Sequence, residues 1–453
     1  MFKRKKSTNI DESGISKEFM TIFWPTLLMA SALMLSNVFN GIIVGNLLGS
    51  NELAAINLAF PVIQLFSIIY FIFGVGGSSL VSYFQGKLDD REANRFFSVT
   101  LIGMIVIGIT ISILGTLFID PLSSFLSRGN IELLSLVKTY LLPIILISPL
   151  PIFISGILYF VRTDYMPKLA SVSIISANVV NLVLTFTLIE FFNFDILAAG
   201  ISYGVGFTVA AIILLFYFFS KKRTLRFTFP DLSFFKNTYD IIKAGFSPGL
   251  SSALMFFKIL SINQILLFSS GKIAVIAFSV CQAALSLASM FISGSTQTMI
   301  PLVSRFLGEE NKEGIRFIFR KTAIILAICV VGLVIFVELF PGIFAQAFGI
   351  FNPAELSATV VALRIFTPSL LGVAFAYLIM YFTQVIRKHT IAMFISILEG
   401  LIVVVPLAFI FAMFFSSTGV WVAFIVGEVI SSFIIVLMFG RIFKFDFNKK
   451  IND

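Results

Sequence analysis

Three ionisable residues lie deep inside strongly apolar stretches of the sequence: Lys258, Glu399 and Glu428. A charge inside a membrane is costly, so such residues usually face a bundle interior or a water-filled cavity. We therefore predict a Lys258–Glu399 or Lys258–Glu428 pair, which could be structural or could change its protonation during a transport cycle. Two simpler interpretations stay open. The side chain of Lys258 could reach toward the membrane surface, and Glu428 could be purely structural.

The other polar residues expected within the membrane are uncharged, and most of them lie in the first half of the chain. Two of them, Asn178 and Asn181, are three positions apart and so share one helix face. As candidates for the substrate or ion pathway we take Asn37, Asn40, Asn178, Asn181, Thr185, Lys258, Asn263, Gln282, Glu399 and Glu428.

Groups for catalysis or metal binding are scarce in this sequence. Cys281 and Cys329 both fall in apolar stretches, and the single histidine, His389, falls in a loop expected to be cytoplasmic. Neither residue type forms a cluster at metal-ligand spacing. We therefore expect no metal, no organic cofactor and no enzymatic activity.

The composition indicates which kind of structural element must position the candidate residues. Of 453 residues, 58% are hydrophobic and 12% charged, whereas about 25% are charged in a typical soluble domain. Long apolar runs predict membrane-spanning helices, so we expect an all-α integral membrane protein. Twelve spans are predicted, at about 18–45, 53–83, 96–118, 139–161, 169–190, 197–219, 242–268, 274–304, 322–342, 362–384, 391–413 and 418–440.

The basic residues predict the orientation of these spans. With the N-terminus placed in the cytoplasm, 27 of the 32 Lys and Arg residues fall on the cytoplasmic side. This asymmetry follows the positive-inside rule and places both termini in the cytoplasm of a multi-pass plasma-membrane protein. It also accounts for the net charge of +9 without a nucleic-acid partner. The first apolar stretch is too long for a signal peptide, so we expect it to be retained.

The chain contains an internal repeat. "LVSYFQG" at 80–86 and "LVSRFLG" at 302–308 lie 222 positions apart and share five of seven residues, and "YF" at 159–160 recurs at 381–382. Since each half has six spans, the halves enter the membrane in the same orientation as parallel repeats. Two such lobes could open a central cleft first to one side of the membrane and then to the other. The predicted divisions are a tail (1–17), an N-lobe (18–220), a linker (221–241), a C-lobe (242–441) and a tail (442–453).

Several motifs in this order resemble the multidrug and toxic compound extrusion (MATE) family over essentially the whole chain. They are "GSNELAAINLAFPVIQL", "LVSYFQGKLDDREANRFF", its echo "LVSRFLGEENKEGIRF", "YFVRTDYMPKLA", "YFTQVIRKHTIAMFISIL" and "TGVWVAFIVGEVISS". The resemblance implies a two-lobe V-shaped exporter of amphipathic organic cations, driven by inward H⁺ or Na⁺. The partners implied are a small-molecule substrate and the lipid bilayer, and we expect a monomer.

The sequence departs from the family at the usual ion site. Where many members carry an aspartate in the first and fifth helices, this chain has Asn40 and Thr185, and it has no acidic residue near Phe256 in the seventh. Coupling is therefore expected to use other groups, and Glu399 is the sharpest candidate.

Three alternatives stay open on the sequence alone. A major facilitator also has twelve spans in parallel halves. However, the loop motif typical of that class is missing from the repeated segment in the second half of this chain. A flippase for lipids or lipid-linked saccharides usually lines its cavity with several basic residues, and here only Lys258 lies within a span. An intramembrane enzyme would need convergent acid, base or metal groups.

Overall fold

The computed structural model describes residues 12–86, 89–164, 166–220, 223–229, 234–308, 311–386 and 388–446, and the regular elements in these ranges are all helical. In chain order they are α1 (Glu12–Leu47), α2 (Ser50–Tyr70), the π-helix η1 (Phe71–Val75), α3 (Gly76–Gly86), α4 (Asp90–Leu117), α5 (Ile119–Ser127), α6 (Ile131–Leu146), α7 (Pro149–Thr163), α8 (Pro167–Phe192), α9 (Leu197–Phe219), α10 (Phe234–Gly308), α11 (Lys312–Leu339), α12 (Pro341–Gln346), α13 (Pro353–Phe366), α14 (Ser369–Val385), α15 (His389–Ile397), the π-helix η2 (Leu398–Ile402) and α16 (Val404–Asp446).

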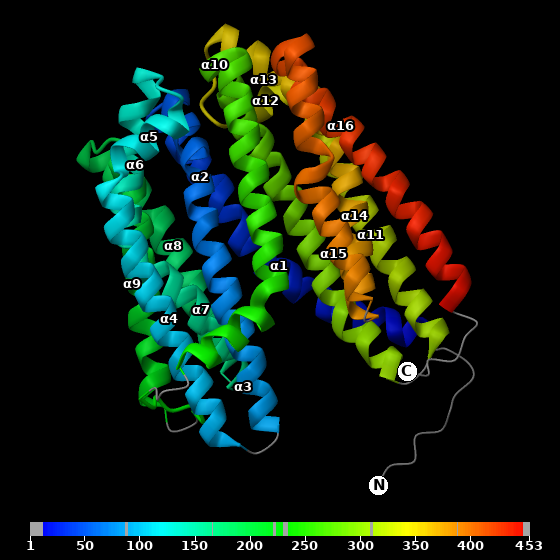
Figure 1. Ribbon diagram of the computed structural model, residues 1–453. Coiled ribbons are helices and arrows are strands. Elements are labelled where there is room, and N and C mark those ends of the chain that lie inside the picture. Colours follow the sequence, from blue (N-terminus) through cyan, green and yellow to red (C-terminus); the bar gives the residue numbers. More distant parts are fainter. Residues whose placement is uncertain are drawn as a thin grey trace.

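These helices agree with twelve membrane spans. Within the described residues, seven helices are long and apolar enough to cross a membrane, or nine when each of two bent pairs counts as one span. Two of the nine are unusually long, and their backbones leave the helical conformation at Gly271 in α10 and at Ser416 in α16. Each long helix reverses direction there and so supplies two spans (Figure 1), and α1 supplies the twelfth. The all-α fold with two repeated halves is confirmed. The lobe boundaries stay predictions, although α10 already begins within the stretch assigned to the linker.

The repeat recurs in the backbone geometry. Gly49 and Gly271, 222 positions apart, both turn the chain at positive φ, 132° and 66°, which glycine adopts without a Cβ clash. Asp89 caps α4 by accepting a hydrogen bond from the Glu92 backbone N–H, and Asn311, again 222 positions on, caps α11 in the same way. The same local signals therefore turn and start matching helices in both lobes.

The two lobes diverge toward the end of the molecule where α1 begins and α16 ends, here called the terminal end, and approach each other at the far end (Figure 1). Two helices cross between them. At its start α1 lies against the C-lobe, where the Lys321 ammonium donates to the Ser16 carbonyl at 3.2 Å. At its start α10 lies against the N-lobe, where a Cβ added to Gly245 would sit 2.0 Å from the Ile72 carbonyl oxygen.

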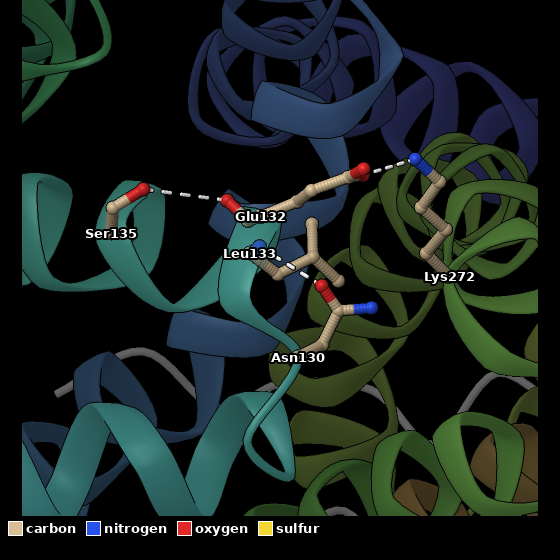
Figure 2. A network of polar contacts seen from close by, with 5 residues as sticks. All are labelled: Asn130, Glu132, Leu133, Ser135 and Lys272. Atoms are coloured by element: carbon tan, nitrogen blue, oxygen red, sulfur yellow. Dashed lines mark hydrogen bonds and ion pairs between the residues drawn. The ribbon is translucent and has the colours of Figure 1, made fainter.

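At the far end the lobes touch through a set of contacts that we call the far-end seam. Asn57 on α2 and Asn263 on α10 are buried and exchange two hydrogen bonds, at 3.2 and 3.0 Å. Nearby, Lys272 of the C-lobe forms an ion pair with Glu132 of the N-lobe (Figure 2). Gly45 is so close to Phe348 that an added Cβ would lie 1.9 Å from the Phe348 carbonyl oxygen. The seam therefore joins the lobes by direct backbone approach as well as by polar contacts.

Asp164 fastens the segment after α9 to the N-lobe. Its carboxylate is fully buried and accepts hydrogen bonds from the Tyr217 hydroxyl at 2.7 Å and from the Thr224 backbone N–H at 3.0 Å. These hydrogen bonds offset the desolvation cost of a buried carboxylate, and they hold the first part of the inter-lobe connection in place.

Replacing Asp164 should therefore destabilise the protein strongly. In Asp164→Ala several buried donors lose their acceptor, each at a cost of about 1–3 kcal/mol. We expect the melting temperature of the detergent-solubilised protein to fall by several degrees. Tyr217→Phe removes only one of these bonds and should lower the melting temperature less. Equal melting temperatures for Asp164→Ala and the unmodified protein would show that this contact is dispensable.

Candidate functional site

The three ionisable residues predicted within the membrane come together in the C-lobe. Lys258 lies on α10, Glu399 in η2 and Glu428 on α16, and the two glutamates are only 5% and 2% exposed. The Lys258 ammonium donates a hydrogen bond of 2.7 Å to the backbone carbonyl of Glu399, and it lies 5.8 Å from the ring centroid of Phe424. Within the described residues no ion pair joins Lys258 to either carboxylate, so the lysine contacts the main chain of Glu399 rather than its side chain.

The backbone carbonyl that accepts from Lys258 belongs to the π-helix η2. A π turn widens an α-helix locally and disturbs its regular hydrogen bonding, and such turns are frequent at functional sites. Gly400 lets this turn approach α10, because an added Cβ would lie only 2.6 Å from the Leu254 Cβ. Leu254 is one helical turn before Lys258, so the same close approach brings the lysine within reach of the turn.

Three of the four carboxyl oxygens of Glu399 and Glu428 are buried without a hydrogen-bond partner. They are Oε1 of Glu399 and both side-chain oxygens of Glu428. The two carboxyl groups nevertheless interact electrostatically with each other and with Lys258. Gly372 on α14 leaves room for Glu428, since an added Cβ would lie 2.6 Å from the Glu428 Cβ. With both carboxyl groups ionised, two carboxylates and one ammonium would leave this group one negative charge in excess.

Sequence reasoning missed Tyr377, which belongs to this group. It lies on α14 and interacts electrostatically with both Glu399 and Glu428. Its spacing of four from Tyr381, which puts both on one helix face, was the signal available in the sequence.

In the N-lobe three of the predicted polar residues lie together on α8. The Asn178 amide donates to the Ile174 backbone carbonyl at 2.8 Å, and the buried Thr185 hydroxyl donates to the Asn181 side-chain oxygen at 3.4 Å. Asn40 lies on α1, which packs against α8, and its side-chain oxygen is buried without a hydrogen-bond partner. Asn37 also lies on α1, but its side chain is outside the described part of the chain.

The two remaining candidates lie elsewhere. The structure places Asn263 in the far-end seam, bonded to Asn57, rather than beside the ionisable group. Gln282 is half-buried on α10, and its backbone carbonyl accepts a hydrogen bond from the Ser286 hydroxyl.

Comparison with known proteins identifies the family. The family model described as MatE matches the chain twice, at residues 25–187 and 249–410. This chain is a member of the MATE family. The two matched segments fall one in each lobe, as the repeat predicts, and the match rules out the major facilitator alternative.

Relatives of this MATE protein cover almost its full length. It is 23% identical to the multidrug export protein MepA of Staphylococcus haemolyticus, over 94% of this chain and 93% of the relative. A solved structure described as the inward-facing conformation of a multidrug resistance MATE family transporter aligns with a TM-score of 0.82 at 20% identity, covering 93% of this chain and 97% of that one. An outward-facing conformation of such a transporter aligns at 0.74 with 21% identity, covering 99% and 100%. Both alignments show that this chain has the fold of these transporters.

Proposed function

We propose that this protein is a secondary active exporter that moves amphipathic organic cations out of the cell across the plasma membrane in exchange for protons. Membership of the MATE family and the similarity to multidrug export proteins support the export of drug-like compounds. The observation that carries the coupling proposal is the buried group of Lys258, Glu399 and Glu428.

The charges of this group favour H⁺ over Na⁺. A buried carboxylate without a partner is strongly unfavourable and takes up a proton more readily than it remains charged. Two carboxylates and one ammonium need one further positive charge to reach neutrality, and a proton supplies it without needing ligands. A sodium ion would need several oxygen ligands close to the ammonium of Lys258, which repels it. An organic cation nearby would neutralise the same excess charge, so proton and substrate would compete for it.

The arrangement of the lobes supports transport by rocking. The far-end seam holds the lobes together on one side, and they diverge on the other, which the basic residues predict to be cytoplasmic. Opening the far-end seam while the terminal ends close would carry a bound cation from the cytoplasm to the outside. The helices α1 and α10 cross between lobes and would have to bend or shift in this step.

The experiment is ethidium efflux from pump-deficient bacteria that express the chain, with a proton gradient, a sodium gradient or neither. We expect efflux that requires the proton gradient and is unaffected by removal of sodium. Efflux that follows the sodium gradient alone would overturn the proton assignment. Absence of efflux under every gradient, at good membrane expression, would overturn organic-cation export and favour a lipid or lipid-linked saccharide as substrate.

A further inference from the structure

The repeated Tyr-Phe dipeptide places its two residues in different environments, in the same way in both lobes. Phe160 on α7 and Phe382 on α14 are fully buried. Phe160 packs edge-on against Phe97 at a centroid distance of 5.3 Å, and Phe382 packs against Phe319 at 4.5 Å. Tyr159 and Tyr381, the preceding residues, are only half-buried. Each phenylalanine thus anchors its lobe, and each tyrosine is left at the margin of that lobe.

The two tyrosines approach each other across the lobe boundary. Tyr159 belongs to the N-lobe and Tyr381 to the C-lobe, yet they are close enough to interact electrostatically. Both lie four residues before the end of their helices, α7 and α14, toward the terminal end. This pairing follows from the parallel repeat, because a two-fold relation between lobes brings equivalent residues to face each other.

Each tyrosine extends into a small aromatic surface of its own lobe. Tyr159 contacts Phe71 of η1, with ring centroids 6.3 Å apart, and Tyr381 lies 6.4 Å from Tyr377, one turn away on α14. Tyr377 in turn interacts with the carboxyl groups of Glu399 and Glu428. The aromatic surface therefore continues from the tyrosine pair to the buried negative charge.

A cation already lies over one of these rings. The guanidinium of Arg162, an exposed residue one turn after Tyr159, lies 6.0 Å from the centroid of the Tyr159 ring. Aromatic faces attract cations at this distance, and guanidinium groups are the usual partners in proteins. Arg162 thus shows that this ring face is accessible to a positive charge, and it would compete with any other cation for that place.

We propose that Tyr159 and Tyr381 form a substrate-contact site for flat aromatic cations, between the divergent terminal ends of the lobes and the carboxyl group pair. A flat cation that lies between the lobes can contact both rings, because one ring comes from each lobe. Its charge then lies on the path to Glu399 and Glu428. This inference rests on the proposed export of organic cations and adds the residues that select the flat, aromatic members of that class.

The test is ethidium binding to the purified, detergent-solubilised protein, followed by the fluorescence of the dye. Tyr159→Ala and Tyr381→Ala should each weaken binding about three- to tenfold, the loss expected for one cation–ring contact. Tyr159→Phe and Tyr381→Phe keep the ring and should bind ethidium like the unmodified protein. Tyr239→Ala, which removes an exposed tyrosine at the start of α10, is the matched control and should leave binding unchanged.

Arg162→Gln separates substrate contact from a structural role. Removing the guanidinium frees the Tyr159 ring face and removes a positive charge, so ethidium should bind about three- to tenfold more tightly. Unchanged or weaker binding in Arg162→Gln, or unchanged binding in both alanine variants, would overturn the proposed site. In these cases the unmodified protein still binds ethidium and the proposed function stands. If the unmodified protein neither binds nor exports ethidium, the proposed function itself fails.

Discussion

Glu399→Gln should abolish proton-driven efflux. The substitution keeps the shape of the side chain but removes one of two negative charges, so the group with Lys258 and Glu428 becomes neutral without a proton. The neutral group then gains nothing by binding a proton, so neither substrate release nor lobe movement is linked to the proton gradient. We expect the initial rate of ethidium efflux under a proton gradient to fall about tenfold or more, equivalent to at least about 1.4 kcal/mol. Glu428→Gln should have the same effect, because it leaves the same net charge.

The pH dependence of binding distinguishes this loss from simple damage. If proton and cation compete for one negative charge, ethidium binding to the unmodified protein should weaken as the pH falls. In Glu399→Gln and Glu428→Gln that dependence should disappear, while the melting temperature stays close to that of the unmodified protein. Glu190→Gln, at an exposed position near the end of α8, is the matched control and should retain both efflux and pH dependence. A variant that loses efflux but keeps the original pH dependence would exclude these carboxyl groups from coupling.

Much of the fold could be predicted because the membrane imposes strong local rules. Every span needs a long apolar helix, and basic residues separate the two sides. The repeat then required parallel halves, and the structure places Gly49 and Gly271 at equivalent turns. The two crossing helices could not be predicted. Whether the start of α1 packs on its own lobe or on the other depends on tertiary contacts such as that between Ser16 and Lys321, which leave no periodic signal in sequence.

The candidate site was predictable in its members but not in its geometry. The free-energy cost of burying a charge in the membrane is enough to identify Lys258, Glu399 and Glu428, since charged residues inside spans are usually functional. The contact of the lysine with a backbone carbonyl depends on the π turn at η2 and on the space left by Gly400. Neither follows from hydrophobic periodicity. The place of Asn263 in the pathway stays a prediction, and its hydrogen bonds with Asn57 of the other lobe leave no signal in the sequence.

Gly45→Val should hold the far end of the protein open. In the present arrangement the added Cβ would lie 1.9 Å from the Phe348 carbonyl oxygen and 2.8 Å from its carbon, so backbone on both sides must separate. The cost of overpacking is typically about 1–3 kcal/mol. It applies only to the state in which the far-end seam is closed, so that state should become about 5- to 150-fold less populated relative to the other.

Thiol crosslinking across the seam can measure this change. The side chains of Glu132 and Lys272 form an ion pair between the lobes. Cysteines at these two positions should therefore be joined readily by a short bis-maleimide, which spans the length of the two replaced side chains, once Cys281 and Cys329 have been changed to alanine. Adding Gly45→Val should reduce the crosslinked fraction strongly, and ethidium efflux should fall with it. Gly332→Val is the control, because a Cβ at this position on α11 meets nothing within 4 Å. Equal crosslinking in the Gly45→Val and Gly332→Val proteins would mean that the lobes do not separate at this seam. A smaller crosslinked fraction with ethidium efflux preserved would show instead that opening the seam is not rate-limiting for export.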